Sequence, residues 1–132
     1  MREILFRGKE PQGNWSYGGL IQSANNFYIS IETDKGFICA YVKPETVGQY
    51  TCLTDKNGKK IFEGDIVKRE YTLWHGETKK TRETQIGVVS YSNKDCGFCL
   101  DKVCNLRKPW DGDTLEIIGN IHDNPELLEV KE

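Results

Sequence analysis

The sequence predicts a mainly β fold: a small SH3-like barrel or twisted sandwich of about eight short antiparallel strands with a short C-terminal helix. Short stretches in which apolar and polar residues alternate indicate strands. Dense turn signals rich in Gly, Asn, Asp and Pro separate these stretches. A length of 132 residues fits one domain, so we expect a single domain over residues 1–132.

The segment Pro44–Lys68 organises the predicted strands. Asn57-Gly58 tolerates the positive φ of a tight hairpin, so a turn is expected at Asp55–Gly58. Glu63–Asp65 predicts a second turn, which leads into a strand at Ile66. Two turns this close together fix the directions of three extended pieces.

The other strands follow from period-2 patterns and from apolar runs between turns. They are expected near residues 4–6, 15–18, 27–32, 37–42, 66–74, 86–91, 97–102 and 115–121. In 27–32, Phe27, Ile29 and Ile31 occupy one face, whereas 37–42 is apolar on both faces.

Two segments between or after these strands have their own signals. Residues 75–82 are polar throughout, which predicts a mobile loop at a hairpin tip. Asn124 before Pro125 predicts a helix N-cap and first turn, and the helix can extend only to about Val130. Leu127 or Leu128 would then pack onto the barrel or sheet.

Composition indicates a cytoplasmic protein without a membrane span. No apolar run approaches the roughly 20 residues of a transmembrane helix, and the start lacks a secretory h-region. The odd number of cysteines, five, favours free thiols in a reducing compartment.

Charge is uneven along the chain, although the net charge is only −2. The segment from Asp55 to Arg82 contains eight Lys/Arg and five Asp/Glu. The segment from Pro109 to Glu132 contains one Lys/Arg and seven Asp/Glu. The simplest interpretation is two solvated faces. The alternative is a basic edge that meets an anionic partner.

The strongest metal candidate is Cys96, Cys99 and Cys104, because two thiolates at CxxC spacing can bind one Zn²⁺. A fourth ligand would have to be His75, His122 or a distant cysteine. Cys96 and Cys99 also fall in a predicted strand, where they would point to opposite faces. Free, partly buried thiols are therefore preferred, and no cofactor is expected.

Catalytic signals are weak. His122, oriented by Asp65 or Asp123, is the one candidate centre, but a histidine at a strand-to-helix corner more often satisfies backbone groups. The sequence has no phosphate-binding glycine loop, nucleophile elbow or zinc-protease motif. We therefore assign no catalytic residue and consider a binding protein more consistent with the sequence than an enzyme.

Four segments together resemble the YopX family of small bacteriophage and prophage proteins. They are Phe6–Lys9, Gly13–Gly18, Pro44–Lys68 and Glu116–Leu128. Their order and spacing match from end to end, although the middle, roughly 70–113, shows no such resemblance. One departure is Cys52, where the resemblance implies a glycine after Tyr50-Thr51.

The resemblance implies a β-rich protein with an SH3-like barrel that is encoded by a phage or prophage and can form homo-oligomers. It supplies no established activity and no catalytic residues. The first function hypothesis is a non-catalytic module that binds a host or phage protein.

The second hypothesis is nucleic-acid binding through the basic segment 68–82. Aromatic side chains would stack on bases beside cations that contact phosphates. The candidate partner-binding residues are Tyr71, Trp74, Lys79, Lys80 and Arg82. The third and weakest hypothesis is an enzyme of unrecognised type.

Overall fold

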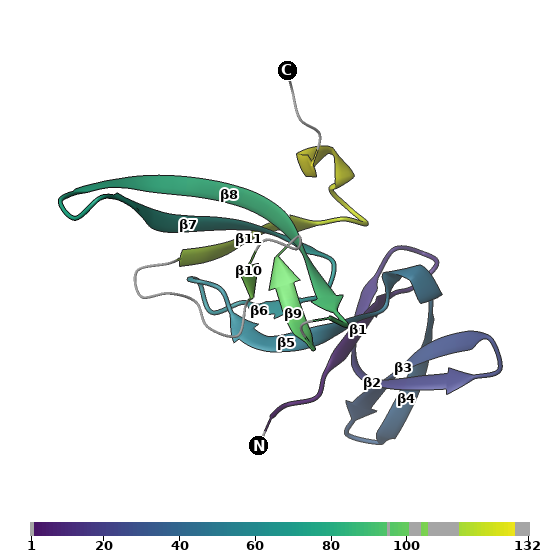
Figure 1. Ribbon diagram of the computed structural model, residues 1–132. Helices are drawn as coiled ribbons and strands as arrows, with labels where there is room; N and C mark the ends of the chain where they lie inside the picture. Colours follow the sequence, from purple (N-terminus) through teal and green to yellow (C-terminus); the bar gives the residue numbers. More distant parts are fainter. Residues whose placement is uncertain (1, 95, 101–103, 106–113, 129–132) are drawn as a thin grey trace. The chain divides into compact units, whose positions relative to one another are not determined.

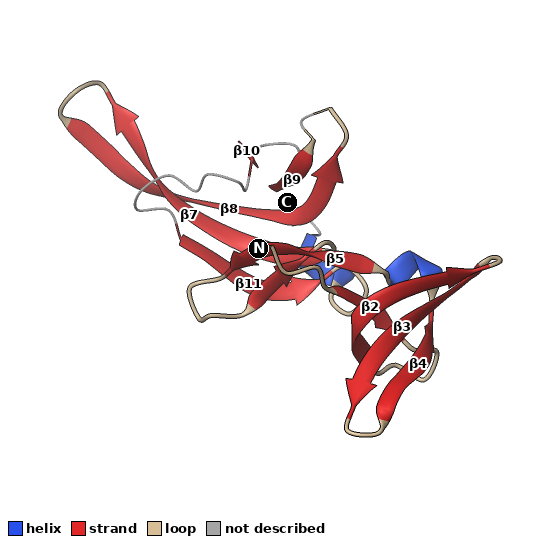
Figure 2. Ribbon diagram, turned by 90° about the horizontal axis from the view of Figure 1, so that it is seen from below, coloured by secondary structure: helices blue, strands red, loops and turns tan. Residues whose placement is uncertain are grey.

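The structure is a computed structural model, and it describes residues 2–94, 96–100, 104–105 and 114–128. The chain divides into two compact units, Met1–Cys52 and Leu53–Glu132. Figure 2 shows that strands dominate both units and that the helical segments are short. The mainly β prediction is therefore confirmed, with antiparallel sheets and no closed barrel over the described residues.

Unit 1 is a curled antiparallel sheet in the order β4-β3-β2-β1-β5 (Figure 1). Its elements are β1 (Phe6–Lys9), β2 (Trp15–Ser23), β3 (Asn26–Thr33), β4 (Gly36–Val42), the 3₁₀ helix η1 (Pro44–Thr46) and β5 (Gly48–Thr54), whose last two residues belong to unit 2. The N–H of Lys43, just after β4, donates to the carbonyl of Lys9 at the end of β1, 2.8 Å away, so the end of β4 lies beside the end of β1. Ile29 and Val42 are fully buried on its inner face.

Unit 2 contains a second antiparallel sheet in the order β10-β9-β8-β7-β11. Its elements are β6 (Lys60–Phe62), β7 (Asp65–His75), β8 (Lys79–Ser92), β9 (Gly97–Leu100), β10 (Cys104–Asn105), β11 (Thr114–Asn120) and the 3₁₀ helix η2 (Pro125–Leu128). The buried residues Ile61, Val67, Val89, Leu100 and Leu115 form its hydrophobic core.

The predicted turn at Asp55–Gly58 is confirmed, and it is attached to β11. Gly58 has φ +81° and donates to the carbonyl of Asp55. Asp55 is 5 % exposed and accepts backbone N–H groups from Asn57, Lys59 and Ile117. Burial raises the pKa of Asp55, but the N–H groups of Ile117, Lys59 and Asn57 and the charge of Lys59 outweigh burial and hold that pKa below its ordinary value.

The second predicted turn is also confirmed. Gly64, with φ +90°, donates to the carbonyl of Val89 and accepts from the N–H of Ile121. Asp65 is buried and accepts the N–H of Phe62 at 2.8 Å. The turn therefore ties the start of β7 to β8 and to the residue after β11.

The segment 75–82 does lie at a hairpin tip, as predicted, but most of it is strand and not loop. β7 continues to His75 and β8 begins at Lys79, so only residues 76–78 form the turn. The polar residues pair across the two strands, for example Thr72 with Arg82. A ribbon exposed on both faces has no apolar alternation that would mark its strands in the sequence.

The predicted C-terminal helix is also wrong over its described part, since 125–128 form a 3₁₀ helix. Asn124 Oδ1 lies 3.3 Å from the N–H of Asn120 and accepts from it, which fixes a compact corner after β11. Leu127 does contact the strand: its Cδ1 would lie 2.9 Å from a Cβ added at Gly119. Residues 129–130 of the predicted helix and 101–102 of the predicted strand lie outside the described residues.

Candidate functional site

Unit 1 presents a row of three large side chains across one face of its sheet. Ile21 on β2 lies opposite Tyr28 on β3, and Tyr28 lies opposite Tyr41 on β4. The rings of Tyr28 and Tyr41 are 5.8 Å apart and tilted by 60°. Directly paired residues share a face, so this row is continuous over three strands.

Two more residues of β4 extend this row. Cys39 pairs with Ser30, and Phe37 pairs with Glu32, two and four positions along β4 from Tyr41 and on the same face. Phe37 is 71 % exposed, Tyr41 45 % and Ile21 40 %. We call the set Ile21, Tyr28, Phe37, Cys39 and Tyr41 the β2–β4 face.

The β2–β4 face is unusual because its exposed apolar residues are neighbours. Single exposed apolar side chains are common on proteins, whereas contiguous patches mark binding surfaces. Aromatic side chains lose little conformational entropy when a partner covers them. This face can therefore bind an apolar surface, and it carries no group suited to catalysis beyond the Cys39 thiol.

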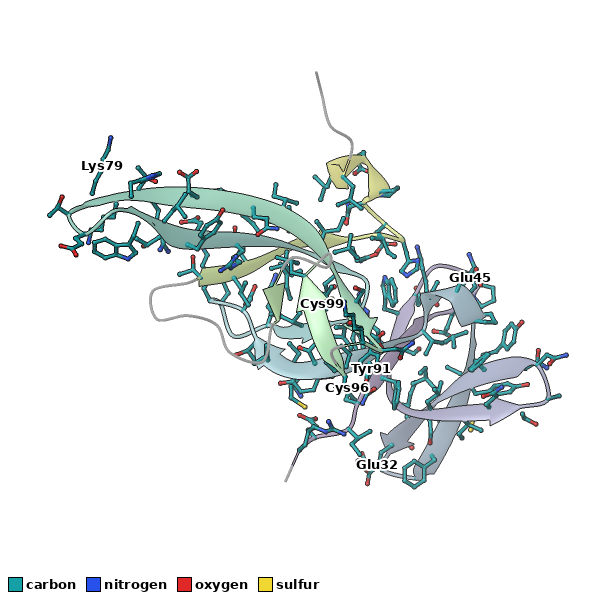
Figure 3. The ribbon with its side chains drawn as sticks, viewed as in Figure 1. Glu32, Glu45, Lys79, Tyr91, Cys96 and Cys99 are labelled. Carbon is teal, nitrogen blue, oxygen red and sulfur yellow. The ribbon has the colours of Figure 1, made fainter. Side chains whose placement is uncertain are left out.

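Unit 2 presents a two-stranded arm. β11 pairs with β7 only as far as Glu70, and β9 pairs with β8 only from Val89. Among the described residues, 71–75 and 79–84 therefore have backbone partners only in each other's strand. Figure 1 shows β7 and β8 side by side out to the turn, and Figure 3 shows Lys79 at the far end of this arm.

The arm divides the five candidate partner-binding residues between two faces. Trp74 pairs with Lys80, and Thr72 pairs with Arg82, so Trp74, Lys80 and Arg82 share one face. Tyr71 pairs with Glu83, and Lys79 pairs with His75, on the opposite face. One flat partner can contact only one of these sets.

The face with Trp74 combines an aromatic ring with cations. Trp74 is 58 % exposed, and the Lys80 Nζ lies 5.4 Å from the centre of its ring. The Arg82 guanidinium donates to Thr72 Oγ1 at 3.1 Å. Exposed tryptophan beside cations is suited to bases and phosphates, or to an acidic protein surface.

The opposite face of the arm is more polar. Thr81 donates to Glu83 Oε1 at 2.9 Å and lies 3.0 Å from His75 Nε2. Because the only hydroxyl proton of Thr81 goes to Glu83, His75 Nε2 is the donor to Thr81. The Arg69 guanidinium covers the Tyr71 ring at 4.4 Å, so Tyr71 has a cation on it already.

The cysteines of the candidate metal set have different surroundings. Cys96 is exposed, precedes β9 with φ +52° and lies 3.6 Å from the carbonyl of Asn93. Cys99 is buried, and its sulfur lies 3.6 Å from Ser90 Oγ. Cys104 pairs with Leu100 through the backbone, but its side chain lies outside the described residues. In the part of the chain that is described, no group of three His, Cys, Asp or Glu could hold a metal ion.

His122 lies in the corner between β11 and η2. Its N–H and that of Asp123 both donate to Asn120 Oδ1, and Asn120 Nδ2 donates to Asp123 Oδ2 at 3.1 Å. These contacts hold the corner together. Asp65 accepts from Phe62 at the other turn.

The β2–β4 face was missed as a site by the sequence analysis. The signal was present, because 37–42 is apolar on both sides and yet lies between charged turns. The sequence analysis used that pattern only to predict a strand and assigned it no binding role. β4 is instead the last strand in its sheet, and Gly36 through Cys39 are exposed.

Comparison with solved structures finds three similar chains, whereas comparison with curated sequences gives no match. The crystal structure of protein EF1440 from Enterococcus faecalis is similar with a TM-score of 0.57 and 22 % sequence identity. The similarity covers 98 % of this chain and 100 % of that chain, and at this identity it shows the fold alone. The family model for YopX protein matches residues 6–129. The resemblance found in the sequence is therefore confirmed, and the chain belongs to the YopX family.

Proposed function

We propose that this protein is a non-catalytic protein-binding module, encoded by a phage or prophage and acting in the cytoplasm of the bacterial host. The observation that carries the proposal is the contiguous, exposed β2–β4 face. Its partner is a host or phage protein with an apolar patch. Tyr28 and Tyr41 add hydroxyl groups that can hydrogen-bond to the partner, as is common at protein interfaces.

The test is affinity capture of the tagged protein from host lysate, with half of the sample treated with nuclease. We expect a stoichiometric protein that survives nuclease and is lost when Phe37 and Tyr41 are replaced by Asp. Tyr91→Asp is the matched control, because Tyr91 is similarly exposed (49 %) but lies in β8 of unit 2. Equal capture by all three proteins contradicts the proposal.

A second candidate function, nucleic-acid binding, is favoured by one observation: Trp74, Lys80 and Arg82 share one face of the arm. A two-stranded ribbon fits the major groove of DNA, and an exposed tryptophan can stack on unpaired bases. Lys68 on the same face is 3.8 Å from Glu70, and this pair lowers the local excess of positive charge.

The two faces of the arm supply the control for this function. Lys80→Glu with Arg82→Glu reverses two charges on the Trp74 face, whereas Lys79→Glu changes the opposite face. We expect the first variant to lose salt-dependent retention of DNA or RNA and the second to keep it. Retention that is unaffected by either change contradicts a role for the arm.

A further inference from the structure

The outward edge of β4 has a defined set of backbone groups. Thr33 and Gly36 close the two-residue turn between β3 and β4 and pair with each other. The closing pair of such a turn exchanges both backbone hydrogen bonds, and hydrogen-bonded pairs then alternate along the ladder. Ile38 and Ala40 therefore bond to β3, and the N–H and C=O groups of Phe37, Cys39 and Tyr41 point away from it.

Lys43 supports this assignment. It continues the same alternation, and its N–H donates outward to the carbonyl of Lys9. Apart from this contact just after its end, β4 has no neighbour on its outward side, because it is the terminal strand of its sheet among the described strands. Phe37, Cys39 and Tyr41 thus carry six outward backbone groups along an edge of β4 that no described strand pairs with.

This edge lacks the features that usually prevent strand addition. Natural edge strands carry a lysine, a proline or a bulge that blocks another strand. Gly36–Val42 contains no charged residue and no proline, and its pairing with β3 runs without a register shift. Phe37, Ile38 and Cys39 are all exposed.

We propose that the β4 edge binds the β4 edge of a second copy of this chain, antiparallel and centred on Cys39. With Cys39 at the centre, each residue whose backbone groups point outward lies opposite such a residue in the other copy. Cys39 faces Cys39 of the partner subunit, and Phe37 faces Tyr41 of the partner subunit. Both aromatic pairs lie on the β2–β4 face, where cross-strand aromatic pairs stabilise a sheet. No charge within the five-residue ladder opposes self-pairing, and a two-fold axis produces the antiparallel arrangement directly.

The inference rests on the proposed function, because it assigns a protein partner to β4, the strand that carries Phe37, Cys39 and Tyr41 of the β2–β4 face. It also makes a chemical prediction. Facing residues in a hydrogen-bonded antiparallel pair have Cα atoms about 5.5 Å apart, inside the 4.4–6.8 Å range of disulfides. An added two-electron oxidant, such as a small-molecule disulfide that is itself reduced to two thiols, should therefore convert the two Cys39 thiols into a disulfide that joins two copies.

The test is sedimentation of the full chain over a range of concentrations, with non-reducing electrophoresis after oxidation. We expect a reduced dimer at high concentration and a Cys39-dependent covalent dimer after oxidation. Cys39→Ser should keep the reduced dimer and lose the covalent one. Cys39→Pro and Cys39→Lys should be folded monomers, because the first removes an outward donor without touching the β3 ladder and the second places two lysines face to face.

Other outcomes overturn the inference. A Cys39→Pro protein that dimerises like the wild type excludes this edge, and so does a covalent dimer that forms through Cys52 or Cys96. A wild-type protein that stays monomeric at every concentration also excludes the dimer. If that monomer still captures a partner in a manner sensitive to Phe37 and Tyr41, the proposed function stands alone. If the protein dimerises through this edge but captures no host or phage protein, the dimer is supported and the proposed binding of a host or phage protein is contradicted.

Discussion

The carboxylate of Asp55 accepts the backbone N–H of Ile117, 62 positions later in the chain, at 3.1 Å. The neighbouring Lys56 N–H donates to the carbonyl of Leu115 at 2.8 Å, and Lys56 Nζ lies 3.3 Å from Glu116 Oε2. The turn therefore covers the outer edge of β11, the edge that β7 does not use. The strand needs this cover because exposed backbone edges pair with other chains.

Replacing Asp55 by Ala should destabilise the protein. Three backbone donors, from Asn57, Lys59 and Ile117, would lose their acceptor, at a cost of about 2–4 kcal/mol in the free energy of unfolding. Urea unfolding measures this loss. Asp34→Ala, at an exposed aspartate of the β3–β4 turn, is the control and should change little. Equal stability of the two variants would show that the Asp55 contacts contribute nothing.

The lowered pKa of Asp55 predicts that the free energy of unfolding decreases at acid pH. The folded pKa of Asp55 is lowered, so its stabilising effect is fully present above the unfolded pKa of about 3.9 and is lost as the pH falls through the folded pKa. Asp55→Asn should reduce stability at neutral pH and lose less stability than the wild type below about pH 4. Parallel pH profiles for the two proteins would contradict this assignment.

Gly18 and Gly19 should respond oppositely to alanine. A Cβ added at Gly18 would overlap the carbonyl oxygen of Ser30, which belongs to the backbone of β3 and cannot rotate away. Gly18→Ala should cost at least about 2 kcal/mol. At Gly19 the nearest atom to such a Cβ is Ser30 Cβ at 3.9 Å, so Gly19→Ala should be neutral or slightly stabilising. Thermal unfolding of both variants distinguishes them, and a neutral Gly18→Ala would refute the close approach.

Cys52→Gly should be more stable than Cys52→Ala by about 1 kcal/mol. Cys52 has φ +71°, in the region that favours glycine, and this explains why the family resemblance implies glycine there. Alanine keeps that backbone strain and loses the contact of the Cys52 sulfur with the Glu3 carbonyl, 3.4 Å away. Glycine loses the same contact but relieves the strain. Equilibrium unfolding of both variants provides the measurement, and an alanine variant as stable as the glycine variant would argue against strain.

Local signals predicted the parts of the fold that local chemistry determines. Gly58 and Gly64 specify turns, and Phe27, Ile29 and Ile31 mark one face of β3. The order of strands depends on partners far away in the sequence, such as Asp55 and Ile117, and no periodicity reveals it. For the same reason, the position of β4 at the end of its sheet could not be deduced from its own residues.

The candidate residues of the arm show the same limit. Composition placed Tyr71, Trp74, Lys79, Lys80 and Arg82 in one segment, but the register of the hairpin decides which of them share a face. A shift of one residue in the pairing would have placed Trp74 on one face with Lys79, and Tyr71 on the other face with Lys80 and Arg82. Register here is set by the turn at 76–78 and by pairs such as Trp74 with Lys80.

The length of the β7–β8 hairpin can change without affecting the folding of the rest of unit 2. Its outer residues pair only across the two strands, while the core residues Val67 and Val89 lie at its base. Two residues inserted on each side of the turn would lengthen the ribbon and leave each existing pair and its face unchanged. In evolution or design, this arm can therefore gain or lose reach and change its chemistry while the base of the sheet stays the same.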